Sequence, residues 1–220
     1  MIYVNGDGIA AASYAACPYS CAGDDASYTL YGVSPHPKNL EASFAKFLSN
    51  VFHQQLTVNA HETSCHAKIF RQTMEAIENS HKIRYVVIAW PDFYRGEIWS
   101  HGNDVQFNFG QRSDFVGNIF HGEAVQQYIK NFTIQAAHAE FNRMLEDLCS
   151  FMDERKIQHA MVMSNNQVDA KSGNWVMDPK TDNVMKWAQP LGLLNSSGYL
   201  NPKGHIELAK LIIPLLTNQL

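Results

Sequence analysis

The alternation of apolar and polar positions along the chain predicts short strands separated by helices. Strands are expected at 2–5, 56–59, 84–90 and 159–165, where apolar residues occur without a helical spacing. The third of these segments is apolar at consecutive positions, so both of its faces should be buried, as in the centre of a parallel sheet. Strands that alternate with helices in this way favour an open α/β sheet whose carboxyl edge binds ligands.

Apolar residues at helical spacing fill the segments between the predicted strands. One helix is expected from Asn39, and its apolar stripe consists of Leu40, Phe44, Phe47, Leu48 and Val51. A second helix is expected through Ile69, Thr73, Met74 and Ile77. A long helical region spans 125–152. These helices should cover both faces of the sheet.

The last helix has the clearest start signal. Asn201 suits the N-cap and Pro202 the first helical position. Pro214 is expected to kink this helix or end it early. His205 lies inside the helix, and we interpret it as a structural residue rather than a base.

The chain length favours one domain over residues 1–220. Two irregular segments interrupt the predicted pattern. Residues 9–38 are rich in Ala, Ser, Tyr, Gly and Pro, which predicts a long loop whose aromatic residues either contact a ligand or neighbouring subunit or pack onto the base of the loop. Alternation at Val105, Phe107 and Phe109 predicts a hairpin insertion within 98–118.

Charge and hydropathy exclude several classes of partner. The formal net charge is −4, and Lys and Arg are scattered, so nucleic acid and anionic membranes are not expected as partners. No apolar stretch reaches the roughly 18 residues of a membrane span. The first residues lack a basic segment followed by a long apolar one, so no signal peptide is expected.

The cysteines could be read as part of a zinc site. Thiolates of Cys17, Cys21 and Cys65 with the imidazoles of His61 and His66 are the usual zinc ligands. Because the spacing does not give a ligand pair on both arms, we favour reduced thiols, and the same holds for Cys149. We therefore expect neither a metal nor a cofactor.

Two short motifs resemble those of the SGNH, or GDSL, hydrolase family. Asn5-Gly6-Asp7 at the end of the first strand is similar to the family's Gly-Asp-Ser block. The stretch Leu200-Asn201-Pro202-Lys203-Gly204-His205 is similar to the start of the family's last helix. The resemblance implies a three-layer α/β/α sandwich with a mostly parallel, flavodoxin-like sheet.

The catalytic positions of that family carry other residues in this chain. Gly8 occupies the position of the nucleophilic serine, and Tyr199 that of the histidine. Ser197 or Ser196 stands where the aspartate is expected. A glycine cannot form an acyl-enzyme, and a phenol with a pKa near 10 is not a neutral base at pH 7. The resemblance therefore implies a degenerate triad and no catalytic residues.

The oxyanion-binding positions also differ from the family pattern. The block 59–66 contains no glycine, so Thr63 or Ser64 is expected to crowd the space for an oxyanion. The third block carries Asp92 where the family has an asparagine donor, and a carboxylate would repel the developing charge. The expected vestigial cleft comprises Asp7, Gly8, Thr63, Ser64, Trp90, Asp92, Arg95 and Tyr199.

The favoured hypothesis is a non-catalytic binding or structural module. Its expected partners are another protein or a second copy of the chain, with a carbohydrate or small ester as the ligand of the cleft. The segment from Trp90 to Glu97 resembles SGNH-like proteins of tailed phages, which implies a virion or accessory protein located in the virion or the host cytoplasm.

Two other functions stay open. One is an active acyl or carbohydrate esterase with Ser13, Ser20 or Ser64 as nucleophile and His61 or His66 as base. The other is a nucleotide binder that uses residues 5–8 as a phosphate turn. The second is disfavoured because the carboxylate of Asp7 would oppose a phosphate.

Overall fold

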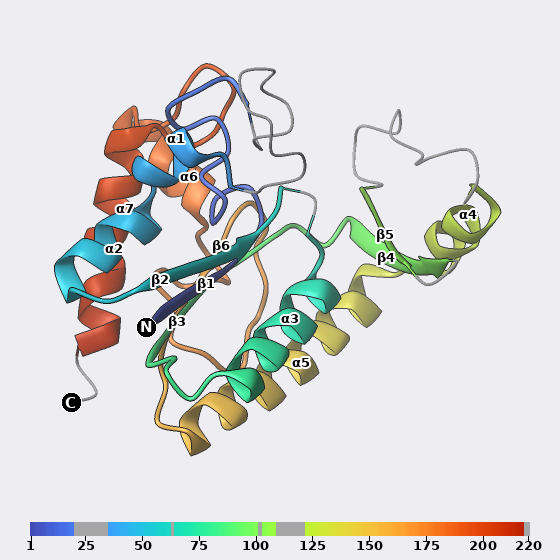
Figure 1. The fold of residues 1–220 in the computed structure, drawn as a ribbon. Helices are drawn as coiled ribbons and strands as arrows, with labels where there is room; N and C mark the ends of the chain where they lie inside the picture. Colours follow the sequence, from blue (N-terminus) through green and yellow to red (C-terminus); the bar gives the residue numbers. More distant parts are fainter. Residues whose placement is uncertain (20–34, 63, 101–102, 109–121, 218–220) are drawn as a thin grey trace.

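Four parallel strands form the central sheet of the computed structural model (Figure 1). The structure describes residues 1–19, 35–62, 64–100, 103–108 and 122–217. The strands, in the order β2-β1-β3-β6, are β1 (Ile2–Gly6), β2 (Leu56–Ala60), β3 (Tyr85–Trp90) and β6 (Gln158–Met163). All three pairings are parallel, which confirms the predicted sheet.

Helices cover both faces of the sheet and complete a three-layer α/β/α sandwich (Figure 1). Strand β3 shows why both layers are needed, because its successive side chains point to opposite faces. Val87 packs in the core beneath α2 and α7, whereas Val86 and Ile88 pack in the core beneath α3 and α5. These helices are α2 (Phe44–Phe52), α7 (Pro202–Thr217), α3 (His66–Asn79) and α5 (Ile134–Glu154).

The helix predicted from Asn39 is two helices in the structure. Helix α1 (Pro37–Glu41) ends before Ser43, and α2 starts after it. The Ser43 hydroxyl donates to the carbonyl of Leu40 at 2.6 Å and accepts from the backbone N–H of Lys46 at 3.0 Å. The same side chain thus closes one helix and caps the next. Val51 was wrongly assigned to the buried stripe, since it is 44% exposed.

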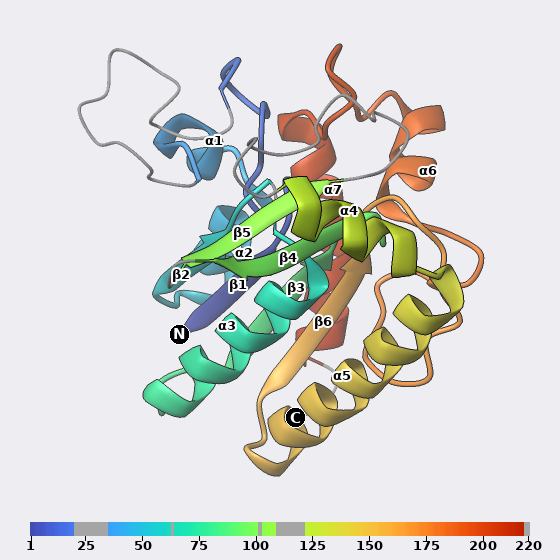
Figure 2. The same ribbon diagram turned by 90° about the vertical axis from the view of Figure 1, so that its right-hand side faces the viewer.

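The predicted hairpin is present, but it begins earlier than expected. Its antiparallel strands are β4 (Arg95–Ser100) and β5 (Asn103–Asn108), and residues 109–118 of the predicted range lie outside the described part of the chain. Figures 1 and 2 show this hairpin beside α4 (Gly122–Asn131), away from the central sheet. Strand β4 follows β3 closely, so it stays near the carboxyl edge of the sheet.

The predicted long loop 9–38 is only partly described. Its first residues, Ile9, Ala10 and Ala11, form a buried turn against the core. Residues 20–34 lie outside the described part. The segment 35–38 already leads into α1.

The C-terminal part begins with α6 (Val184–Ala188) and the 3₁₀ turn η3 (Gln189–Leu191) and ends with α7. Asn201 Oδ1 accepts from the N–H of Gly204 at 2.9 Å, which is the predicted N-cap bond. The helix continues through Pro214 to Thr217, so an early end at Pro214 was wrong. Burial of Leu216 beyond the proline stabilises this last turn. None of the described helices is long and apolar enough to cross a membrane.

Gly6 fixes the geometry where β1 leaves the sheet. Its φ is 144°, a value that side chains rarely allow, and an added Cβ would lie 2.3 Å from the carbonyl oxygen of Ala89 on β3. Asn5 holds the same bend from the other side, since its Oδ1 accepts from the Gly6 N–H at 2.8 Å. Only glycine fits this close approach between the two central strands.

Replacing Gly6 with alanine should therefore lower the free energy of unfolding by roughly 3–5 kcal/mol, because backbone atoms must move. Gly192→Ala is the matched control. Gly192 also has positive φ but meets nothing within 4 Å, so its substitution should cost only about 1–2 kcal/mol. Urea unfolding of the two variants measures both values, and equal losses would contradict the steric account.

Candidate functional site

The candidate site is the carboxyl edge of the sheet, where four strands end together. Asp7 and Gly8 follow β1, and Glu62 lies two residues beyond β2. Asp92 follows β3 in the same way, and the next strand begins with Arg95. These are the positions at which open α/β folds carry their ligand sites. We call this group of residues, together with Tyr199, the crevice.

The turn after β1 is closed by its own hydrogen bonds. Asp7 Oδ1 accepts from the N–H of Ile9 at 3.0 Å, and the Gly8 carbonyl accepts from the N–H of Ser13 at 2.8 Å. The Asp7 carboxylate thus already accepts a hydrogen bond from a backbone N–H that a bound phosphate would need. This contact weakens the nucleotide-binding alternative.

Tyr199 and Glu62 lie against Gly8. A Cβ added at Gly8 would lie 3.1 Å from Tyr199 Cε1, 3.4 Å from Ser13 Oγ and 3.6 Å from Glu62 Cγ. The Tyr199 hydroxyl donates to the Glu62 carboxylate, and its ring lies 4.9 Å from that of Tyr14. Tyr199 and Gly8, which the resemblance places at the histidine and serine positions, therefore face each other.

The Tyr199 hydroxyl is not a base at pH 7. Burial raises the pKa of its hydroxyl above the usual range, and the hydrogen bond to Glu62 raises it further. The group therefore stays a neutral phenol whose proton is directed to a carboxylate. Such a group can donate a hydrogen bond or pack against a ligand, but it does not take a proton from a serine at pH 7.

Asn195 holds the Tyr199 turn in place, although nothing in the sequence analysis assigned it a role. Its Oδ1 accepts from the N–H groups of Ser197 at 2.9 Å and Tyr199 at 3.1 Å, and its Nδ2 donates to the carbonyl of Tyr14 at 2.8 Å. Asn-Ser-Ser-Gly is a turn signal that could have revealed it. Ser196 and Ser197, at the position expected for the aspartate, are both exposed on this turn.

Arg95 links the acidic residues of the crevice. Its Nη2 lies 4.0 Å from Asp7 Oδ2, its Nε lies 3.4 Å from Asp92 Oδ2, and its Nη1 donates to the carbonyl of Glu62. Burial raises the pKa of Asp7, and the neighbouring guanidinium opposes that rise. Because Arg95 offsets the negative charge of Asp92, this carboxylate should repel an oxyanion less than the sequence suggested. The same pairing leaves Arg95 committed to carboxylates rather than to a ligand.

One of the expected cleft residues lies elsewhere in the structure. Trp90 is fully buried beneath α3 and α5, where its ring contacts His66 and Phe141, so it does not line the crevice. The reason is the alternation of β3, which directs this side chain to the opposite face from Ala89. Ser64 is buried, and Thr63 lies outside the described residues.

Among the described residues, the candidate serine hydroxyls of the rewired esterase form no hydrogen bond with the candidate histidines. The hydroxyls of Ser13 and Ser64 are buried and have no hydrogen-bond partner in the described part of the chain. His66 is enclosed by aromatic rings, and burial lowers its pKa to about 3. His61 is exposed, and Ser20 lies outside the described residues.

The remaining histidine and cysteine candidates lie apart from the crevice. His205 is buried in α7, stacks on Phe44 at 6.0 Å, and has its pKa lowered to about 3 by burial. Cys17 Sγ lies 3.3 Å from His36 Nδ1. Cys65 lies at the start of α3, and Cys149 lies within α5. Over the ranges that the structure describes, no three His, Cys, Asp or Glu side chains could hold a metal ion together.

Solved structures show the same fold. No protein-family model and no curated protein matches this sequence. The crystal structure of TesA is similar over 100% of this chain and 99% of its own, at 9% identity and a TM-score of 0.54. The chain therefore has the three-layer α/β/α fold of SGNH/GDSL-type hydrolases.

Two further structures are similar with lower scores. The psychrotrophic esterase EstA from Pseudoalteromonas sp. matches over 99% of this chain and 97% of its own, at 11% identity and a TM-score of 0.49. A lipolytic protein of the G-D-S-L family from Desulfitobacterium hafniense matches over 97% and 98%, at 8% identity and a TM-score of 0.46.

The buried histidines predict a pH dependence of stability. The pKa of His205 is near 6.5 in the unfolded chain and about 3 in the folded protein. As the pH falls, the histidine of the unfolded chain therefore binds a proton before that of the folded protein. Its neutral form therefore stabilises the fold fully above pH 6.5, and this contribution falls by up to about 1.4 kcal/mol per pH unit below it. His205→Leu should remove one such slope between pH 5 and 6.5, measured by urea unfolding. An unchanged slope would show that His205 titrates in the folded state.

Proposed function

We propose that this protein is a non-catalytic binding or structural module built on an SGNH-hydrolase-type fold. One observation carries the proposal: the ring of Tyr199, hydrogen-bonded to Glu62, lies over Gly8 where the family places a histidine over a serine. The crevice thus lacks a nucleophilic hydroxyl at Gly8 and a proton acceptor above it. In a comparable hydrolase the loss of the serine or the histidine costs roughly 10⁶ in turnover.

The groups that stay in the crevice suit recognition rather than hydrolysis. Tyr14 and Tyr199 offer aromatic rings, and Asp92, which Arg95 holds in place, is a partly exposed hydrogen-bond acceptor. Rings and fixed hydrogen-bonding groups of this kind can hold a sugar or a small ester without breaking it. We infer a carbohydrate or a small ester as the ligand class.

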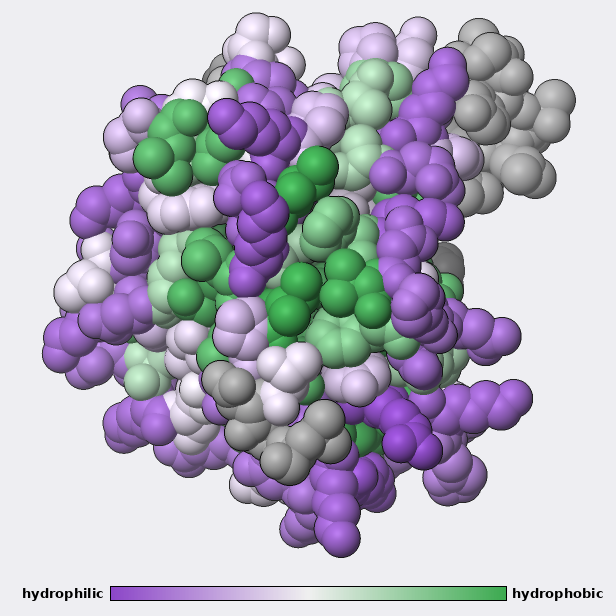
Figure 3. Space-filling view, turned by 90° about the vertical axis from the view of Figure 1, so that its left-hand side faces the viewer, coloured by the Kyte–Doolittle hydropathy of each residue, from purple (hydrophilic) through white to green (hydrophobic). Residues whose placement is uncertain are grey.

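A protein partner is the second part of the proposal. Figure 3 shows apolar side chains gathered on the face formed by α2 and α7. The exposed large apolar residues of these helices are Val51, Ile206 and Leu211. Apolar surface of this kind supports binding of another protein or a second copy of the chain. A role in a phage particle stays a proposal that rests on the resemblance of the segment from Trp90 to Glu97.

A fluorophosphonate probe and short-chain p-nitrophenyl esters test the lack of hydrolysis. The purified protein should show neither labelling nor turnover above buffer. Gly8→Ser should restore neither, because Tyr199 stays a phenol bonded to Glu62 and leaves the new hydroxyl without a base.

Ser13→Ala and Ser64→Ala are the control variants for this test. If the wild-type protein is labelled and one of these substitutions abolishes the labelling, the protein is an esterase with a relocated nucleophile, and the proposal is wrong. Circular dichroism of each variant verifies that the comparison is made on folded protein.

A further inference from the structure

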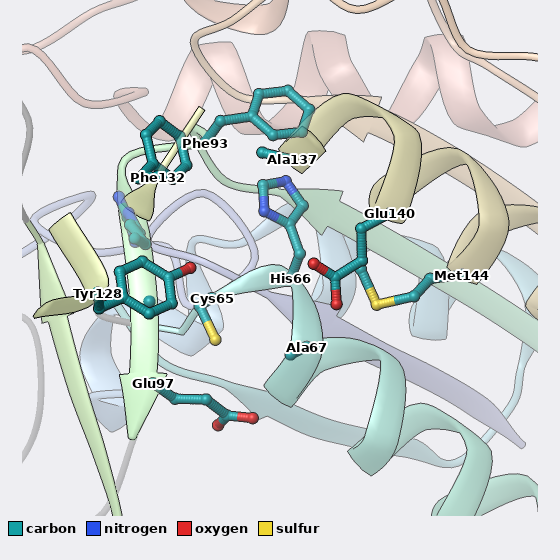
Figure 4. Close-up of a pocket in the computed structure, with 12 residues that line it drawn as sticks. Cys65, His66, Ala67, Phe93, Glu97, Tyr128, Phe132, Ala137, Glu140 and Met144 are labelled. Carbon is teal, nitrogen blue, oxygen red and sulfur yellow. The ribbon is translucent and has the colours of Figure 1, made fainter. Parts of the chain in front are cut away.

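A second site lies outside the crevice, between the hairpin and the helices beside it. It is a pocket of about 190 Å³ formed by the start of α3, strand β4, the end of α4 with the residues after it, and α5 (Figure 4). Its polar lining includes Cys65, His66, Glu97, Tyr128 and Glu140. None of these residues takes part in the proposed hydrolase-like crevice, so the inference does not rest on the proposed function.

His66 contributes a buried ring to the wall of the pocket. The side chain is only 7% exposed, and its Nε2, itself buried, has no hydrogen-bond partner among the described residues. The carbonyl of Pro91 interacts with the ring, and a neutral imidazole has a single N–H to donate. Burial, with a smaller contribution from Arg95, lowers the pKa of His66 to about 3, so the ring is neutral at pH 7. With its N–H directed to Pro91, the ring is an uncharged part of the pocket wall.

The charged lining of the pocket is predominantly acidic. Figure 4 shows the Glu140 carboxylate and the Tyr128 hydroxyl pointing toward one another, with Glu97 nearby. Arg71 forms a two-fold ion pair with Glu97, at 2.6 and 3.2 Å. Glu140 has no ion pair with any residue of the described ranges. The Glu140 carboxylate thus faces a space in which the described lining offers it no cation.

Arg95 is the one cationic residue among the described residues that line the pocket, and its guanidinium is directed elsewhere. It pairs with Asp7 and Asp92 and donates to the carbonyl of Glu62, all on the crevice side. These partners largely offset the positive charge of Arg95, so a ligand in the pocket experiences little of it. An anionic ligand would meet Glu140 and Glu97 without gaining a free guanidinium.

The walls of the pocket are aromatic. Phe93 stacks on the His66 ring at 4.6 Å, and Tyr128 from α4 and Phe132 just after this helix also line the pocket. Aromatic faces attract ammonium and guanidinium groups through their quadrupole, and a nearby carboxylate adds to this attraction. A cavity of roughly 150 Å³ holds a benzene molecule, so a space of this size holds a headgroup of about six heavy atoms.

We propose that this pocket binds an organic cation, an alkylammonium or alkylguanidinium group, with the Glu140 carboxylate as its acceptor. The cation can belong to a free amine or to a lysine or arginine side chain of a partner protein. Both sources present the same group to Glu140, and the aromatic walls surround its alkyl stem.

Calorimetric titration of the full chain with n-butylammonium and n-butylguanidinium tests the proposal. Saturable binding is expected at about 1 mM, as befits a ligand of so few atoms. The neutral isostere n-pentanol should bind at least tenfold more weakly, because it lacks the charge that Glu140 recognises. Nα-acetyl-lysine methylamide and putrescine distinguish the two sources, since the better ligand identifies a side chain or a free amine.

Glu140→Gln should weaken binding of both cations about tenfold or more. Glu146→Gln is the matched control, since Glu146 is exposed on the same helix, carries the same charge and does not line this pocket. Both positions are exposed, so both variants should fold. Absence of saturable cation binding, or equal affinities of the two variants, would overturn the proposal.

Discussion

The hydrogen bond between the Tyr199 hydroxyl and the Glu62 carboxylate is the contact on which the interpretation of the crevice depends. It joins the segment after β2 to the turn before α7 and lays an aromatic ring over Gly8. A glycine is compatible with this arrangement because any side chain at position 8 would press against the ring. Gly8 and the phenol ring of Tyr199 are therefore two parts of one packing arrangement, in which the ring fills the space above position 8.

The same edge of the sheet is stabilised by charges that a hydrolase would need for other purposes. Arg95 is largely buried, and its guanidinium lies between Asp7 and Asp92. Removing a single member of such a cluster would leave an uncompensated buried charge, which is costly. Arg95 also separates the crevice from the pocket near Glu140, so the two sites share a wall but present different chemistry.

The sequence pattern was sufficient for the framework of the fold but not for the site. Apolar runs placed the four parallel strands, and the Asn201 cap placed the last helix, because both signals are local. The pairing of Tyr199 with Glu62 joins residues that are 137 positions apart, and no local pattern encodes it. Trp90 was misplaced because a strand that is apolar on both faces does not reveal which side a given residue takes.

Two local details also could not be predicted from the pattern of apolar and polar residues. The helix predicted from Asn39 divides at Ser43, since a side chain that can cap a helix also fits within a helical stripe. The role of Arg95 needed the position of its partners, because a lone arginine at the start of a strand predicts only a charged residue. Such contacts arise where separate elements meet at the sheet edge.

A double-mutant cycle on Tyr199 and Glu62 tests the central claim most directly. The free energies of unfolding of Tyr199→Phe, Glu62→Ala and the double variant, measured by urea titration, give the coupling between the two side chains. The account predicts a coupling of about 1–3 kcal/mol, as befits a partly buried hydrogen bond to a carboxylate. A coupling near zero would mean that the ring is not held over Gly8, and the crevice would then be open to a different chemistry.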